Sequence, residues 1–124
     1  MIKRILTAAV IGLAALGYQA AHAHGGAAPK HGGVVQTASD LSFELVATPE
    51  GAALYVEDHG KPVNPAGMSG KLTVLNGTEK SEAALSASGD KLEATGVKLS
   101  KGARAVAALT TADKKAITVR FTVK

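Results

Sequence analysis

Short segments in which apolar and polar residues alternate restrict this chain to a fold built from β-strands. The clearest segment spans residues 116–123, whose alternating apolar members are Ile117, Val119, Phe121 and Val123. A period of two places these side chains on one face of a strand, whereas an amphipathic helix needs apolar residues every three or four positions. The segment therefore predicts a strand with one buried face and one exposed face.

Other segments have a similar pattern, and turn-forming Gly, Pro, Asn, Asp or Ser residues separate them. The expected strands are Leu41–Thr48, Ala53–Asp58, Lys71–Leu75, Ser81–Ala87, Lys91–Thr95, Ala103–Thr111 and Ala116–Val123. Val34–Thr37 can add a short first strand, and the Glu and Ala content of Ser81–Ala87 would also suit a helix. About seven short strands with turn signals about every 8–12 residues predict an all-β fold. We expect a small antiparallel immunoglobulin-like β-sandwich over residues 34–124, with Asn76-Gly77 at the turn of one hairpin.

Residues 1–23 have the pattern of a secretory signal peptide. Lys3 and Arg4 precede the apolar run Ile5–Leu16, and Ala21-His22-Ala23 has the small residues that signal peptidase recognises. The apolar run is too short for a stable transmembrane helix, although an uncleaved membrane anchor is the alternative. We expect cleavage after Ala23, a periplasmic location, and no membrane association after cleavage.

Cleavage after Ala23 would make His24 the first residue of a His- and Gly-rich arm, residues 24–33. The tripeptide His24-Gly25-Gly26 recurs as His31-Gly32-Gly33, and four glycines in ten residues disfavour a strand or a helix interior. We therefore expect a flexible arm. The α-amine and imidazole of an N-terminal histidine can chelate one metal ion, and His31 can add a second imidazole. Such nitrogen ligands favour Cu(II), then Ni(II) or Zn(II); the alternative is a tail whose histidines have no metal role.

The expected domain offers further candidate ligands, each with a structural alternative. Asp58 and His59 follow an expected strand and could complete a metal site or form a solvated turn. Met68 could offer its thioether to Cu(I) or fill a gap in the core. Asp40 could bind a metal ion or belong to a turn before a strand. No cofactor is expected to be permanently bound.

The composition argues against several functional classes. The chain has no cysteine, which excludes a sulfur-rich cage for zinc or Cu(I) and a cysteine nucleophile. The 14 Lys and Arg residues exceed the 10 Asp and Glu residues, but they are scattered and only 3% of residues are aromatic. Nucleic-acid binding is therefore not expected. His59 is the only histidine of the expected domain, and we do not expect an enzyme.

The sequence resembles a family of small exported bacterial proteins with a His-Gly-Gly motif. The matching elements are the two His-Gly-Gly tripeptides, Val34-Val35, Asp40, Phe43-Glu44-Leu45-Val46, Leu54-Tyr55-Val56, Asp58 and Gly60-Lys61-Pro62-Val63. Similar modules lie at the front of periplasmic adaptor subunits of heavy-metal efflux pumps, and others occur alone near copper and heavy-metal resistance systems. The resemblance implies a small β-sandwich with a periplasmic role in metal handling. It carries over His31 and Asp58 as functional positions.

Two hypotheses follow for the function. The first is a periplasmic metal-binding protein that buffers Cu(II), or alternatively Zn(II) or Ni(II), or carries it to a heavy-metal efflux or resistance system. Its candidate ligands are His24, His31, His59 and Asp58, and its partner would be a periplasmic efflux-pump component. The second hypothesis is an immunoglobulin-like interaction or structural module of the cell envelope that docks through a sheet edge and has no metal role.

Overall fold

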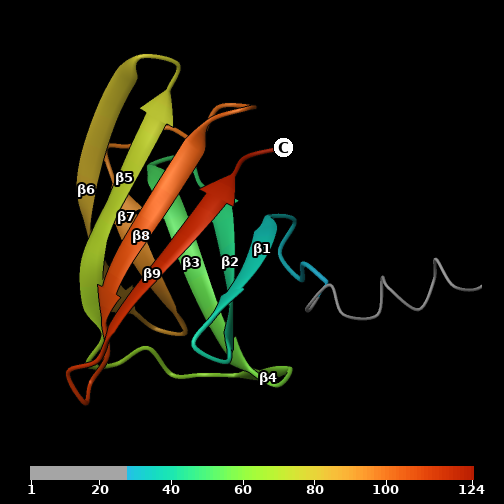
Figure 1. Ribbon diagram of the computed structural model, residues 1–124, viewed down its shortest axis with the longest axis vertical. Helices are drawn as coiled ribbons and strands as arrows, with labels where there is room; N and C mark the ends of the chain where they lie inside the picture. The colour runs from blue at the N-terminus through green and yellow to red at the C-terminus, as the bar shows by residue number, and fades with distance from the viewer. Residues whose placement is uncertain (1–27) are drawn as a thin grey trace, which may run out of the picture.

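The computed structural model describes residues 28–124 (Figure 1). The expected signal peptide, residues 1–23, and the candidate ligand His24 lie outside the described residues. The strands are β1 (Val34–Ala38), β2 (Leu41–Ala47), β3 (Gly51–Asp58), β4 (Lys61–Pro62), β5 (Ser69–Asn76), β6 (Glu79–Ser88), β7 (Lys91–Thr95), β8 (Arg104–Thr110) and β9 (Ala116–Thr122).

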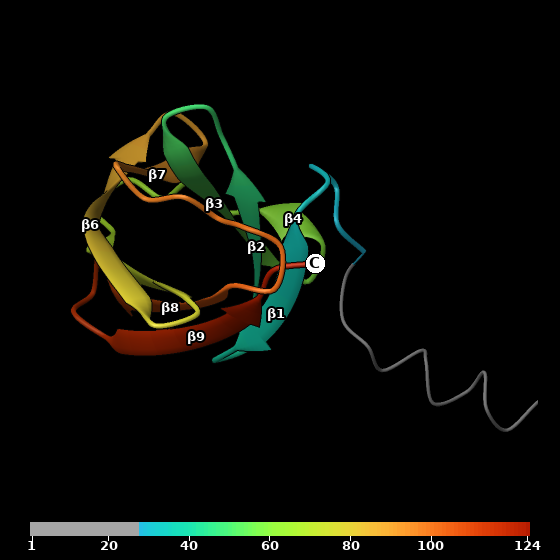
Figure 2. The ribbon, with the colours of Figure 1, turned by 90° about the horizontal axis from the view of Figure 1, so that it is seen from above.

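The nine strands form one antiparallel sheet. Its hydrogen-bonded order is β1-β2-β3-β7-β6-β5-β8-β9, and the short β4 pairs with the end of β3. Seen from above, the sheet curls around the core until its two end strands, β1 and β9, lie side by side (Figure 2). The sheet is therefore nearly closed. Within residues 28–124 no helical segment has the length and apolar character that a membrane span requires.

The all-β, antiparallel prediction is confirmed. Each of the seven expected segments forms a strand, including Ser81–Ala87, which lies within β6. The count rises from about seven strands to nine because β1 forms and because a two-residue strand, Lys61–Pro62, pairs with β3. The predicted hairpin joins β5 to β6, but its turn is shifted by one residue: Asn76 is the last residue of β5 and pairs with Glu79, so Gly77, with a φ of 64°, and Thr78 form the turn.

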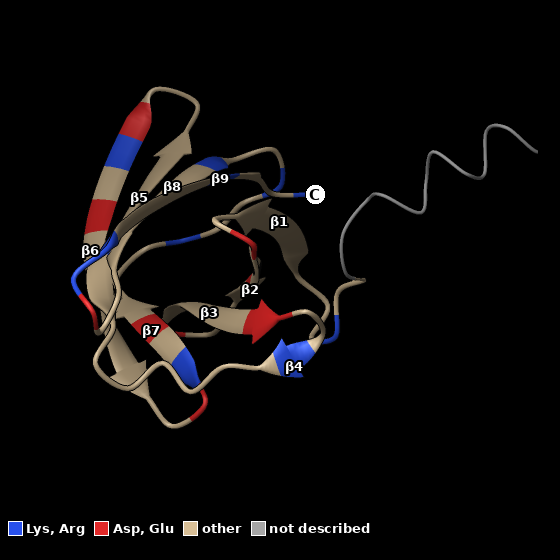
Figure 3. Ribbon diagram, turned by 60° about the horizontal axis from the view of Figure 1, so that its bottom comes forward, with Lys and Arg blue, Asp and Glu red and all other residues tan. Residues whose placement is uncertain are grey.

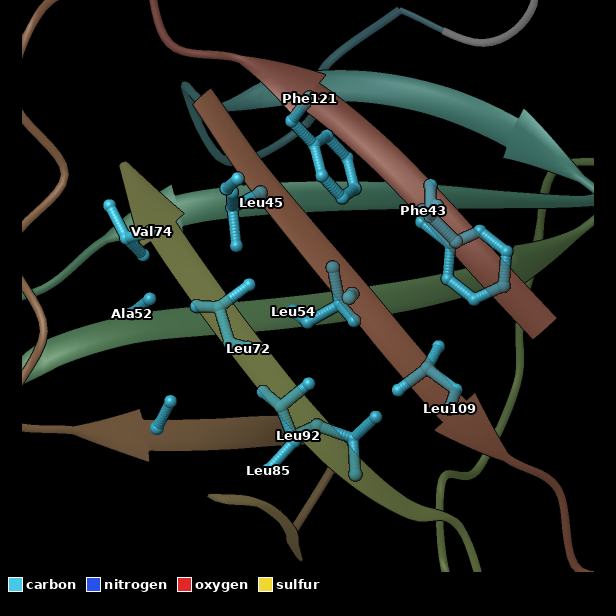
Figure 4. Close-up of a cluster of buried hydrophobic side chains, with 14 of the residues drawn as sticks. Phe43, Leu45, Ala52, Leu54, Leu72, Val74, Leu85, Leu92, Leu109 and Phe121 are labelled. Atoms are coloured by element: carbon cyan, nitrogen blue, oxygen red, sulfur yellow. The ribbon is translucent and has the colours of Figure 1, made fainter. Parts of the chain in front are cut away.

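The apolar side of each strand faces a single core. In β9 the side chains of Ile117, Val119 and Phe121 are buried, while the residues between them are exposed, as the alternation predicts. Figure 4 shows large side chains from opposite parts of the sheet meeting in this core, among them Phe43, Leu45, Leu54, Leu72, Leu85, Leu92 and Leu109. Met68 belongs to the same core, so its thioether fills a gap there rather than lying exposed.

Candidate metal-binding site

Val35, Glu44 and Tyr55 form a row across the outer face of strands β1, β2 and β3. Glu44 lies opposite Val35 of β1 and opposite Tyr55 of β3. Its neighbours Phe43 and Leu45 point into the core, so Glu44 points to the other face of the sheet. That face would be open to solvent if nothing covered it, yet Glu44 is only 6% exposed.

The segment that covers Glu44 is the part of the chain just before β1. The backbone N–H of Lys30 donates to Glu44 Oε1 at 3.1 Å, and the N–H groups of His31 and Gly33 donate to Oε2 at 2.8 Å each. Nδ1 of the His31 ring lies 2.9 Å from Oε1. Residues 30–33, expected as part of a flexible arm, are thus hydrogen-bonded to the sheet through one carboxylate.

These contacts determine the charge state of Glu44. Burial acts to raise the pKa of this carboxyl, but the hydrogen bonds from the His31 ring and from the backbone N–H groups of Gly33, His31 and Lys30 outweigh it. The pKa of Glu44 therefore lies below its ordinary value, and the group is a carboxylate at neutral pH. A buried carboxylate needs such donors, because its charge would otherwise be costly to remove from water.

The two glycines after His31 have a structural reason. Gly32 has a φ of 78°, a left-handed conformation that directs the N–H groups on either side of it to the same carboxylate. A Cβ on Gly33 would overlap the carbonyl oxygen of Leu45 in β2. The second His-Gly-Gly tripeptide therefore allows the chain to wrap Glu44 and then enter β1.

The His31 ring is held on both its edge and its face. Its plane is parallel to the ring of Tyr55 within 4°, and the ring centroids are 3.7 Å apart. The side chain of His31 remains 39% exposed. Because Nδ1 contacts Glu44, Nε2 is the ring nitrogen left to bind another group, as in histidines that ligate metal ions with a carboxylate behind them.

Lys30 ties the same segment to the far end of β3. Its Nζ lies 2.8 Å from Glu57 Oε2 and donates to the carbonyl oxygen of Gly60 at 3.2 Å. Figure 3 shows the acidic end of β3 beside the basic β4, where Asp58 and Lys61 are opposite each other in the strand register. Residues 30–33 therefore lie across β2 and β3 and reach toward the turn that contains His59.

Asp58 and His59, the other predicted ligands, are neighbours: Asp58 is the last residue of β3, and His59 begins the turn to β4. Their side chains are 55% and 84% exposed, and His59 Nδ1 lies 2.6 Å from Asp58 Oδ1. This exposed contact fits a solvated turn. It involves Nδ1 of His59, so Nε2 is not in contact with Asp58. Within residues 28–124 no group of three or more histidine, aspartate or glutamate side chains is arranged to hold a metal ion. His31 and the Asp58–His59 pair are thus two separate candidate positions.

Asp40 has a role in the fold. Ser39 and Asp40 form the two-residue turn between β1 and β2, since Ala38 pairs with Leu41. Both turn residues have positive φ angles, 51° and 64°, as a type I′ hairpin turn requires. The turn interpretation of Asp40 agrees with this geometry.

Sequence reasoning did not single out Glu44 or Tyr55 as site residues. Both are outward-facing strand residues in the structure, and a charged or phenolic side chain is ordinary at such positions. The available signal was a glutamate in the middle of an expected strand, between Phe43 and Leu45. Its burial depends on residues 30–33, which the alternation says nothing about.

Comparison of the chain with models of protein families, with curated proteins and with solved structures finds no match.

Proposed function

We propose that this protein is a periplasmic metal-binding protein that takes Cu(II), or alternatively Zn(II) or Ni(II), as its cargo. It would buffer the metal ion or carry it to a heavy-metal efflux or resistance system. One observation supports this proposal most strongly: the His31 imidazole is fixed by Glu44 and Tyr55 while its side chain stays 39% exposed. A ring held in this way loses little freedom when its remaining nitrogen binds a metal ion.

The ligand set of the proposal combines His31 with the N-terminus. Cleavage after Ala23 would supply the α-amine and imidazole of His24, and His31 would add one further nitrogen. Short loops between ligands close at small entropic cost. Asp58 and His59 are possible additional ligands in the proposal. They lie close to the segment that carries His31, because Lys30 Nζ donates to the carbonyl oxygen of Gly60, the residue after His59.

The test is a calorimetric titration of Cu(II) into the processed protein, whose N-terminus is first established by mass spectrometry. His24→Ala and His31→Ala should each weaken binding by about tenfold or more, which corresponds to about 1.4 kcal/mol. His59→Ala is the matched control and should change the affinity little. A processed protein that starts elsewhere than His24, or unchanged affinity in both arm variants, would contradict the proposed ligand set.

An immunoglobulin-like sandwich remains our proposal for the finer description of the fold. The strands divide into the halves β1-β2-β3-β7 and β6-β5-β8-β9, and the ladder between β6 and β7 joins them through only three residue pairs. Under the second hypothesis, such a module would dock on an envelope protein through a sheet edge. The side-by-side position of β1 and β9 favours the metal hypothesis, because each end strand shields the other. Binding of an envelope protein by a variant that has lost metal binding would favour docking instead.

A further inference from the structure

The buried carboxylate of Glu44 has a chemical consequence for His31 that the ligand set alone does not explain. Both oxygens of Glu44 already accept backbone N–H groups, one from Lys30 at Oε1 and two at Oε2. Three N–H donors favour the ionised carboxylate, which has no proton of its own to donate. The fourth contact, between Oε1 and His31 Nδ1, must therefore have its proton on Nδ1, which donates to the carboxylate.

This proton position determines what the rest of the imidazole can do. In a neutral imidazole with a proton on Nδ1, the lone pair lies on Nε2. A rotation of the ring by half a turn would replace Nδ1 with a carbon at Oε1 and lose the hydrogen bond. Contact with Tyr55 across the whole ring face also restricts tilting of the imidazole.

We propose that Glu44 is a positioning residue that makes Nε2 of His31 the nitrogen that binds the metal ion. Glu44 does not touch the metal ion in this arrangement. It acts through the ring, by holding the proton on Nδ1, and through the backbone, by holding residues 30–33 on β2. The inference rests on the proposed function, because it requires His31 to be a metal ligand.

The first test measures the proton position without any metal ion. Nitrogen-15 NMR of the metal-free protein at neutral to mildly basic pH should show the His31 signals of an imidazole with its proton on Nδ1. His59 is the internal reference, since its partner Asp58 is half-exposed. A His31 ring with its proton on Nε2 would overturn the inference.

The second test identifies the ligating nitrogen in the unaltered protein. Zn(II), which is diamagnetic, should shift the Nε2 signal of His31 strongly and leave a protonated Nδ1 in place. Coordination through Nδ1 would overturn the inference even though metal binding itself had been observed. This measurement needs no variant, so it stands whether or not substitutions at Glu44 fold.

The third test removes the carboxylate and keeps the side-chain shape. Glu44→Gln should weaken Cu(II) binding by about 10- to 100-fold, the usual effect of removing a group that orients a ligand histidine. The matched control is Glu57→Gln, which removes a carboxylate from the same face and its ion pair with Lys30 without touching His31. Glu44→Asp is the second variant, and its affinity should lie between those of Glu44→Gln and the unaltered protein.

The outcomes distinguish the role of Glu44 from the proposed function. Folded Glu44→Gln protein with unchanged Cu(II) affinity would overturn the role of Glu44 while leaving the proposed function intact. Equal losses in Glu44→Gln and Glu57→Gln would also overturn it, because the loss would then not depend on the contact between Glu44 and His31. If the unaltered protein binds neither Cu(II) nor Zn(II), the proposed function fails, and this role for Glu44 fails with it.

Discussion

The imidazole of His31 lies flat against the phenol ring of Tyr55, with 3.7 Å between the ring centroids. His31 precedes the first strand, whereas Tyr55 is an outward-facing residue of β3. The stack therefore fastens the segment before β1 to a strand that is not its direct neighbour.

Replacement of Tyr55 should separate the effect of its ring from that of its hydroxyl. Tyr55→Leu removes the flat surface under His31 and should lower the free energy of unfolding by about 0.5–1.5 kcal/mol beyond the loss of buried area. Tyr55→Phe keeps the ring and should leave both stability and Cu(II) affinity close to those of the unaltered protein. Urea denaturation and calorimetric titration measure the two quantities. Equal defects in both variants would assign the effect to the hydroxyl instead.

Alanine at Gly33 should displace residues 30–33 from the sheet. The added Cβ would overlap the Leu45 carbonyl oxygen, so either β1 or the segment before it must move. Gly32→Ala is the matched control, because its Cβ meets no atom within 4 Å and only the φ of 78° opposes it. We expect that control to cost about 1–2 kcal/mol and Gly33→Ala to cost more, measured by urea denaturation. A smaller cost for Gly33→Ala would mean that the Gly33–Leu45 approach is easily relaxed.

Acid should remove the stabilisation that the Glu44 carboxylate provides. The pKa of Glu44 in the folded protein is lowered from its ordinary value of 4.5. Ionised Glu44 therefore stabilises the native state at pH values above the pKa that the group has in the unfolded chain. This contribution is fully present at neutral pH and is lost as the pH falls below 4.5 and through the lower folded-state pKa. The difference in unfolding free energy between the unaltered protein and Glu44→Gln should therefore shrink in that range.

Salt provides the control for the acid experiment. Glu82 on β6 also has a lowered pKa, caused first by the charges of Lys71 and Lys80, and all three side chains are exposed. Figure 3 shows acidic and basic residues along this strand. Added salt should screen any pH-dependent contribution of Glu82 more than that of Glu44, because Glu44 is only 6% exposed and its contacts are partly buried. A Glu44 contribution that vanishes in salt would contradict the hydrogen bonds from residues 30–33 to this carboxylate.

Removal of metal ions should leave the domain folded. The core is formed by side chains such as Leu54 and Leu72, and the proposed metal position is on the outer face of the sheet. After treatment with a chelator, the protein should keep a cooperative thermal transition whose midpoint differs by a few degrees at most. Circular dichroism measures this midpoint. Unfolding by the chelator would show that the metal ion is structural.

The strands could be predicted from the sequence because their information is local. Alternation in β9 directly gives the burial of Val119 and Phe121, and the turn residues mark the ends. The same alternation correctly placed Glu44 on the outer face. It could not predict that this face is covered, because the donors to Glu44 come from a Gly-rich segment with no periodic pattern. The neighbouring position of β1 and β9 was equally hidden, since it depends on the curvature of the whole sheet.

The position of β1 beside β9 also affects how the chain reaches its native state. These are the first and last of the described strands, so the core stays uncovered on one side until residues 116–122 are in place. The hairpins from β1 to β3, with the Glu44 contacts, join residues close in sequence and are expected to assemble early. A chain interrupted before Ala116 would keep that early unit but leave Phe43 and Leu45 open to proteases and to aggregation. The face that carries Glu44 and Tyr55 is therefore expected to form before the core is fully covered.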